Sequence, residues 1–419
     1  MVADPDSVAA PPDPSQRAAT ILRRAILVTA IGLSCLLGYF TTYVLIGLLF
    51  LTSAWGALDW SRARAYFDSG VGRLPANLFA LAFGLLLVSA ALTGLDGGDL
   101  WTLAGFSALL LYAPLAALFG QAATPSNARK VAEFALFGTA AGLLVAAWFT
   151  YVEGMSRAGL GSFFTDPIRL SNTALIIGFF AMTGAAATQG RQRFLYFLGP
   201  IMALVVIFAS GSRAALIAFP VLLLVAALML VRHKLKALAL SALVLFGFGL
   251  VAYVGDIAGA RSSTLFDILG RLAGGDNPAD LGTAIRFILY RAGWSAFLDA
   301  PLFGHGWSQL MVAIVPYLES FEQAHASLPH LHNDALNFAV AGGVFGLMAY
   351  AILLATPVLC CVLGPRDGQY RIRLYGCSLL SISYLVLGLP DTMLSFPLHN
   401  ALYVVLTAVL LNYCRDSAA

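Results

Sequence analysis

The stretch HLHNDALNFAVAGGVFGLMAYAILL, residues 330–354, opens with a polar, titratable segment and continues as twenty almost wholly apolar residues. A helical run of about 20 apolar residues is long enough to cross a hydrocarbon core of about 30 Å. The stretch therefore predicts a membrane-spanning helix with two histidines, His330 and His332, at its mouth. Gly342 and Gly346 form a GxxxG pattern inside the run, which favours close packing against another helix.

Apolar runs of this length recur along the whole chain. Of the 419 residues, 60% are hydrophobic and only 11% are charged, whereas a soluble domain carries about 25% charged residues. A closed transmembrane barrel would instead show alternating segments of about ten residues. We therefore predict an all-α polytopic membrane protein with about twelve transmembrane helices and one large loop, on the outer side, that contains short helices.

The runs divide the chain into five predicted regions. These are a polar, Pro-rich disordered tail (1–24), transmembrane helices 1–9 (25–255), a helical loop (256–333), transmembrane helices 10–12 (334–413) and a short tail (414–419). A second apolar run follows the first at once, so we expect a retained first span rather than a removed signal peptide. The twelve predicted spans are 25–40, 42–58, 75–92, 100–119, 131–152, 172–188, 194–210, 214–231, 237–255, 334–361, 374–389 and 398–413.

The basic residues predict how these spans are oriented. With twelve spans, 17 of the 24 lysines and arginines fall on the side that holds both termini, and the side richer in Lys and Arg is the cytoplasm. The long loop 256–333 and the two histidines then face the outside. Seven arginines remain on that outer side, and these are Arg157, Arg169, Arg213, Arg261, Arg271, Arg286 and Arg291.

Several classes of protein and site lack support in the sequence. The five cysteines lie within or at the ends of predicted spans, so neither a disulfide framework nor a cysteine metal site is expected. No P-loop, dinucleotide fingerprint or HExxH pattern appears, and we predict no cofactor. The net charge is +3 and the basic residues follow the membrane rule, which gives no support for nucleic-acid binding.

The long loop contains two segments with helical spacing. In LGTAIRFILYRAGWSAFLDA, residues 281–300, apolar residues recur at helical intervals, Asp280 is a plausible N-cap, and Pro301 should end the helix near Asp299. A second helical piece is expected in SQLMVAIVPYLESFEQA, residues 308–324. We expect the loop to form a small folded cap that rests on the membrane.

Three outer arginines are candidates for binding an anion. Arg213 lies in a short turn between two spans, where snorkelling to lipid headgroups is an equal alternative. Arg286 and Arg291 are five residues apart on the predicted loop helix, so they point in different directions and one of them is expected to face the membrane side. Arg261 and Arg271 are interpreted as ordinary loop charges.

The histidine pair has the features of a general base. In an extended segment His330 and His332 point to the same side, and Asn333 or Asp334 can cap the following helix. The positive helix start and the arginines nearby favour a neutral imidazole, the form that a general base needs. Two alternatives stay open: an exposed interfacial pair, or a metal site completed by His305 and His325.

Four ordered pieces of the chain resemble the bacterial O-antigen ligases and the related O-antigen polymerases. They are SGSRAAL around Arg213, AIRFILYRAGWSAFLDAPLFGHGW in the loop, HLHNDALNFAVAGGVFGLMAY, and the plan of about a dozen spans with one large outer loop late in the chain. The motifs cover roughly residues 205–355.

The resemblance implies a metal-independent, inverting glycosyltransferase of the membrane-embedded C type. Such an enzyme takes O-antigen from undecaprenyl diphosphate and transfers it to lipid A–core at the periplasmic face of the bacterial inner membrane. Membrane lipids are its other expected partners. By matched motif, Arg213, Arg286 and Arg291 would hold the diphosphate and His332 would accept the proton. His330 and Asn333 would orient His332 or the sugar.

The sequence leaves other functions and one further residue open. Asp391, in LPDTML, is either an orienting carboxylate for His332 or a solvated loop residue. The same donor chemistry would serve an O-antigen polymerase or a protein O-oligosaccharyltransferase. A lipid or glycan transporter is a different class, but it would place its charges near the bilayer midplane and show inverted repeats.

Overall fold

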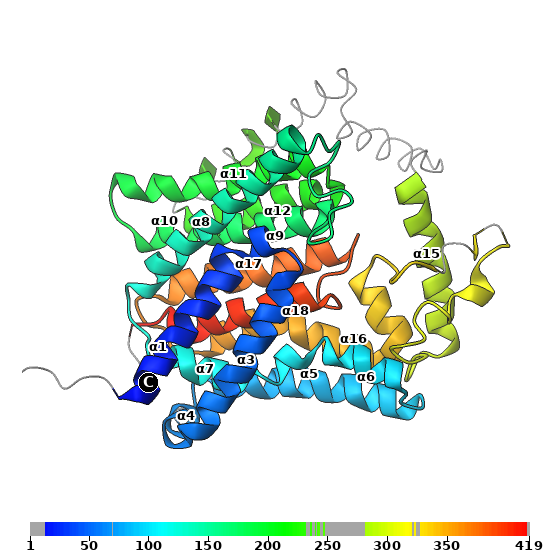
Figure 1. Ribbon diagram of the computed structural model, residues 1–419, viewed down its shortest axis with the longest axis horizontal. Coiled ribbons are helices and arrows are strands. Elements are labelled where there is room, and N and C mark those ends of the chain that lie inside the picture. Colours follow the sequence, from blue (N-terminus) through cyan, green and yellow to red (C-terminus); the bar gives the residue numbers. More distant parts are fainter. Residues whose placement is uncertain are drawn as a thin grey trace, which may run out of the picture.

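The computed structural model describes residues 13–68, 70–231, 281–320, 322–323 and 327–416, with a few positions between 235 and 247. Within these ranges every regular element is a helix (Figure 1), which confirms the predicted all-α class. The described α-helices are α1 (Pro14–Leu27), α2 (Ser34–Leu37), α3 (Phe40–Leu58), α4 (Trp60–Asp68), α5 (Arg73–Leu92), α6 (Gly97–Ala104), α7 (Tyr112–Gly120), α8 (Asn127–Ala147), α9 (Pro167–Ala181), α10 (Thr183–Ala187), α11 (Leu198–Ser210), α12 (Arg213–Leu230), α15 (Leu281–Asp299), α16 (Asp334–Leu363), α17 (Tyr370–Gly388) and α18 (Pro397–Ala408).

Seven helices in the described part of the chain are long and apolar enough to cross a membrane, as expected of a polytopic membrane protein. The predicted number of twelve is not confirmed. The seven are Phe40–Leu58, Arg73–Leu92, Asn127–Val152, Pro167–Ala187, Arg191–Ser210, Arg213–Leu230 and Asp334–Leu363.

Several of the other predicted spans are interrupted helices. Helix α1 begins at Pro14, so the predicted disordered tail 1–24 is wrong for residues 14–24. The run 25–40 contains the end of α1, a π-helical turn and α2, which ends before Gly38 with φ 52°. The run 100–119 divides into α6, a 3-10 turn and α7. Hydropathy reports the apolar length of a run but not these breaks in the helix. The predicted span 237–255 lies largely outside the described residues.

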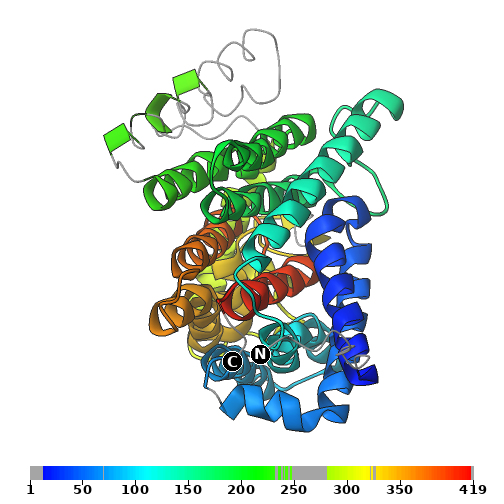
Figure 2. The ribbon, with the colours of Figure 1, turned by 90° about the vertical axis from the view of Figure 1, so that its left-hand side faces the viewer.

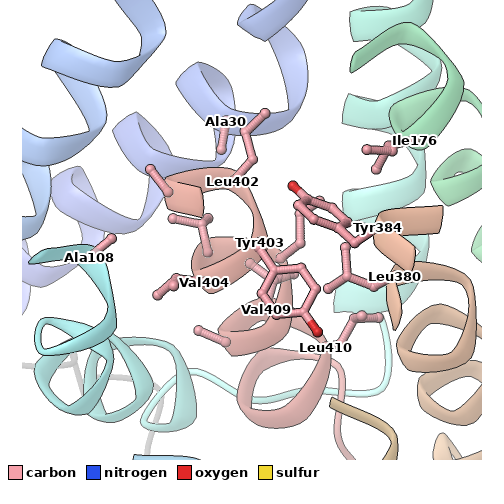
Figure 3. Close-up of a cluster of buried hydrophobic side chains, with 14 of the residues drawn as sticks. Ala30, Ala108, Ile176, Leu380, Tyr384, Leu402, Tyr403, Val404, Val409 and Leu410 are labelled. Carbon is pink, nitrogen blue, oxygen red and sulfur yellow. The ribbon is translucent and has the colours of Figure 1, made fainter. Parts of the chain in front are cut away.

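Helix α18 forms the centre of the bundle. It is drawn in red and runs among the other helices in both views (Figures 1 and 2). Tyr384 of α17 and Tyr403 of α18 pack with ring centroids 4.5 Å apart (Figure 3). The Tyr384 hydroxyl donates to the His399 carbonyl at 2.6 Å, and the Tyr403 hydroxyl donates to the Leu353 carbonyl of α16 at 2.7 Å. These contacts fix the start of α18 and so the loop that precedes it.

Helices α12 and α17 pack side by side in opposite directions. Arg371, at the start of α17, donates from Nε and Nη2 to the carbonyl of Met229, near the end of α12, at 3.1 and 2.9 Å. Consequently α12 begins at the end of the bundle where α17 finishes. Helix α9 also begins there, because Arg169 in its first turn contacts Asp391, three residues beyond α17. We call this the His332 end of the bundle.

The loop helix α15 stands at the edge of the bundle (Figure 1). It ends at Asp299, as the following proline predicts. The predicted second helix over 308–324 is wrong: its described residues form turns and one 3-10 turn, Val315–Tyr317. Pro316 lacks the N–H that a continuing helix needs. A small apolar core instead joins this segment to α15 and α16, formed by Leu289, Ala292, Ala296, Ile314, Leu318, Leu331 and Val340.

Helix α16 is kinked where the turn 301–307 lies against it. At the kink Gly343 has φ 60° and ψ −145°, which an α-helix does not allow. The carbonyls of Val340 and Ala341 accept hydrogen bonds from the backbone of the turn at 2.9 and 3.0 Å, and Val344 N–H donates back to the turn at 2.8 Å. The kink therefore joins the loop to the helix that follows the histidines.

Substituting Gly343 with alanine is expected to destabilise the protein by about 3 kcal/mol or more, because residues with a Cβ rarely adopt the backbone conformation of Gly343. That Cβ would also lie 2.4 Å from the carbonyl oxygen of Leu302. Thermal unfolding in detergent measures the effect. Gly84→Ala in α5 is the matched control, since its Cβ meets open space. Equal melting temperatures for the two variants would contradict the assignment.

Candidate functional site

His332 is held in a strained backbone conformation at the mouth of α16. Its φ is 53°, and no other non-glycine residue in the described ranges has a positive φ. The Tyr290 hydroxyl of α15 donates to the His332 carbonyl at 2.8 Å. Asn333, which follows, caps α16 by accepting from Leu336 N–H at 3.0 Å, as the sequence predicts. Strain of this kind concentrates at functional sites.

The two histidine rings lie against each other, with centroids 4.3 Å apart and planes at 76°. The backbone N–H of His332 donates to Nδ1 of His330 at 3.2 Å. Burial, together with the neighbouring His332 and Arg169, lowers the pKa of His330 to about 3. His330 is therefore neutral at physiological pH and acts as a hydrogen-bond acceptor for its neighbour.

Asp391 faces His332 from the loop between α17 and α18. Its Oδ1 lies 3.5 Å from Nδ1 of His332, and neither atom has a hydrogen-bond partner elsewhere in the described structure. The solvated alternative for Asp391 is wrong, because the residue is fully buried. Burial alone would raise the pKa of Asp391, but the Arg169 guanidinium and the two imidazoles offset it and lower the pKa to about 2.

Arg169 is the residue of this site that the sequence reasoning missed. Its Nη1 lies 2.9 Å from Oδ2 of Asp391 and donates to the Thr392 carbonyl at 2.5 Å. The guanidinium is 4.0 Å from the ring centre of Phe396, and the residue is 4% exposed. The Asp166 side chain caps α9 by accepting a hydrogen bond from the N–H of Arg169 at 2.9 Å. This cap sets the start of the helix and therefore the position of Arg169. An arginine in the first turn of an apolar helix was the available signal.

A second carboxylate, Asp334, fixes the position of the Asp391 loop. Its Oδ2 accepts from the N–H groups of Met393 and Leu394 at 2.9 and 2.7 Å, and its Oδ1 accepts from the Ser395 hydroxyl at 2.9 Å. Asp334 therefore ties the start of α16 to the loop rather than capping its own helix. This clamp sets the distance between Asp391 and His332.

The three candidate arginines are placed differently. Arg286 of α15 donates from Nε to the carbonyl of Pro390, the residue before Asp391, at 3.0 Å. Arg291 instead pairs with Glu322 at 2.6 Å, and its side chain is 55% exposed. Arg213 is the first residue of α12 and so lies at the His332 end of the bundle. The structure thus brings Arg286 next to the histidine pair and commits Arg291 to a partner within the loop.

His330, His332 and Asp391 also form a donor set that a metal ion could use, since their ligand atoms lie within 4.8 Å of one another. A cation there would sit beside the Arg169 guanidinium, which already neutralises the carboxylate and repels a further positive charge. The metal site predicted as an alternative would need His305 as a ligand, but Nε2 of His305 lies 2.7 Å from the Ala296 carbonyl and is engaged there. His325, its other ligand, lies outside the described residues.

The arrangement is suited to proton transfer. With Nδ1 facing the carboxylate of Asp391 at 3.5 Å, Nε2 is the ring nitrogen of His332 that is left to accept a proton. The side chain is 21% exposed, so a substrate hydroxyl has access to it. The buried carboxylate stabilises the imidazolium that forms, and Arg286 adds a fixed positive charge for an anionic leaving group.

Fold and site together define a polytopic helical membrane protein with a histidine–carboxylate pair and arginines at one end of its bundle. Residues 198–351 match the family model described as O-Antigen ligase, which confirms the resemblance read from the sequence. The match indicates an activity of the O-antigen ligase or polymerase type. The matched segment contains Arg213, Arg286 and both histidines, whereas Asp391 and Arg169 lie outside it. No curated protein matches the chain.

Proposed function

We propose that this protein is a glycosyltransferase that moves O-antigen polysaccharide from undecaprenyl diphosphate to lipid A–core at the periplasmic face of the inner membrane. The observation that carries the proposal is the buried Arg169–Asp391 pair beside the strained His332, with Arg286 adjacent. The match to the O-antigen ligase family supports the donor and acceptor classes.

The proposed reaction is a single inverting displacement. A hydroxyl of the acceptor sugar attacks the anomeric carbon of the donor, a new C–O bond forms, and the bond to the diphosphate oxygen breaks. The hydroxyl proton passes to Nε2 of His332. The departing diphosphate gains negative charge, which Arg286 and Arg213 stabilise, because a guanidinium can bind two phosphate oxygens at once. Arg291 has no part in this proposal.

Transfer by the purified protein is expected to persist in excess EDTA, since arginines supply the positive charge that metal-dependent glycosyltransferases take from a divalent cation. The measurement is product formation from a lipid-linked donor, before and after chelation. Loss of activity with EDTA and its recovery with a single added metal would instead assign His330, His332 and Asp391 as ligands.

Replacing Asp391 by asparagine is expected to lower transfer by about tenfold to hundredfold. Because its pKa is about 2, Asp391 is ionised throughout the working range, and the substitution removes a charge that orients and stabilises the His332 imidazolium. The measurement is kcat at saturating substrates, with the melting temperature as a check on folding. A melting temperature as in wild type with unchanged kcat would exclude the orienting role.

Complementation of a ligase-null Gram-negative strain tests the function itself. The strain must supply matched donor and core sugars, and lipopolysaccharide is read as a ladder on a gel. A ladder is the expected result. Lengthened glycan on the lipid carrier without a ladder would identify an O-antigen polymerase, and glycan on protein would identify a protein O-oligosaccharyltransferase. With neither product, the proposed function fails.

A further inference from the structure

A polar cavity lies at the opposite end of the bundle from His332. Helix α3 connects the two regions: Tyr39, just before it, hydrogen-bonds Asp166 beside the Arg169 site, whereas Trp55 in its last turn lines the cavity. The 19 residues of α3 span about 28 Å, which is the thickness of a hydrocarbon core. The cavity therefore lies at the other membrane surface and is separate from the proposed reaction.

The cavity has a volume of about 570 Å³ and is enclosed by α1, the end of α3, α4 and the residue after α7. Its walls combine cations with apolar groups. Three arginines and Gln121 supply the polar side, while Trp55 and Ile21, which is 67% exposed, supply the apolar side. The lining residues are Ser15, Gln16, Arg17, Ala19, Thr20, Ile21, Arg23, Trp55, Arg62 and Gln121.

The positive charge of the cavity is only partly neutralised. Arg62 pairs with Asp59 at 2.8 Å and with Asp13 at 3.2 Å. Arg23 instead donates to neutral oxygens, the Leu118 carbonyl at 3.1 Å and a threonine hydroxyl at 2.9 Å. Burial lowers the pKa of Arg23, as expected of a partly desolvated cation with no ion-pair partner among the described residues.

Two further donors face no acceptor within the described ranges. Arg17 lines the cavity, is exposed, and makes no ion pair there. Gln121 lines it as well, and its Nε2 is buried without a hydrogen-bond partner. A buried donor left without a partner costs about 1–3 kcal/mol. The cavity thus presents donors and cations that an anion with several oxygens would satisfy.

We propose that this cavity binds the phosphate headgroup of an anionic phospholipid. Arg17, Arg23 and Gln121 would contact the phosphate oxygens, and the acyl chains would leave the cavity past Ile21. Basic pockets between helices at a membrane surface are suited to anionic headgroups, and a tryptophan at that depth is typical of the interface. A soluble phosphate would use the same donors but would gain nothing from the exposed apolar wall.

Native mass spectrometry of the whole protein in detergent tests the proposal, with phosphatidylglycerol and phosphatidylcholine of identical acyl chains as probes. Wild type is expected to bind phosphatidylglycerol about tenfold more tightly than phosphatidylcholine. Arg17→Gln is expected to reduce that preference about fivefold, as loss of one surface arginine implies. The double variant with Arg23→Gln is expected to abolish it.

Arg24→Gln is the matched control, because Arg24 is an exposed arginine on the same helix that does not line the cavity. It should leave the preference within about twofold of wild type. Equal losses in Arg17→Gln and Arg24→Gln would overturn the proposal, since they would reflect general surface charge. The proposal would also be overturned if wild type showed no preference for phosphatidylglycerol. Displacement of the lipid by 10 mM inorganic phosphate, roughly the excess that mass action needs against a millimolar site, would overturn it as well. Arg17→Gln removes no internal contact, so the test does not depend on Arg23 variants that fold poorly.

Discussion

Glycan transfer by the His332→Ala variant is expected to fall by about 10³-fold or more. His332 is the group with a basic nitrogen accessible to substrate and a permanent carboxylate behind it. General base catalysis contributes about 10²–10⁴-fold, and without it the acceptor hydroxyl must lose its proton to water, a much weaker base than imidazole. The measurement is turnover with purified donor and acceptor, compared at equal amounts of folded protein.

The backbone at His332 requires a second variant. At φ 53° alanine adds strain, whereas asparagine tolerates the left-handed region. His332→Asn should therefore fold as wild type and still be inactive. His330→Ala is the comparison within the pair: His330 is neutral and only accepts a hydrogen bond from its neighbour, so a loss of about tenfold at most is expected. Substantial turnover by His332→Asn would remove His332 from the role of base.

The parts of the fold that the sequence predicted are those governed by local signals. Apolar length indicated the membrane class, Pro301 indicated where α15 ends, and Asn333 was one of the two residues predicted to cap α16. Each of these depends on residues within a few positions of one another, where propensity and periodicity carry information. The extended backbone expected at the two histidines is wrong, because His332 has a φ of 53°; their rings lie 4.3 Å apart in this different conformation.

The rest of the site depends on contacts between distant segments. Arg169 and Asp391 are 222 residues apart, and Asp334 reaches the Asp391 loop across about 60 residues. Nothing local to Asp391 distinguishes a buried, paired carboxylate from a solvated one. Arg286 and Arg291 lie on the same helix, and the fold gives them different partners: the Pro390 carbonyl for Arg286 and the Glu322 carboxylate for Arg291. Packing of the bundle decides these roles.

Arg286→Ala is expected to lower kcat by about 10²–10³-fold, the usual cost of removing one fixed group that stabilises transition-state charge. Arg286 donates to the carbonyl of Pro390 and so lies beside the His332–Asp391 pair, where the leaving diphosphate must be held. Arg286→Lys should recover part of the loss, because it keeps the charge but not the planar fork that binds two oxygens. The measurement is kcat and KM for the lipid-linked donor.

Arg291→Ala provides the matched control on the same helix. Its guanidinium pairs with Glu322 and is largely exposed, so transfer should stay within about fivefold of wild type, the size of an exposed ion pair. The contrast separates chemistry from folding, because both variants remove an arginine from α15. If Arg291→Ala proved the more damaging of the two, the diphosphate would have to bind on the Glu322 side of α15. The base and the leaving group would then no longer share one site. That result would contradict the single-displacement reaction proposed for His332.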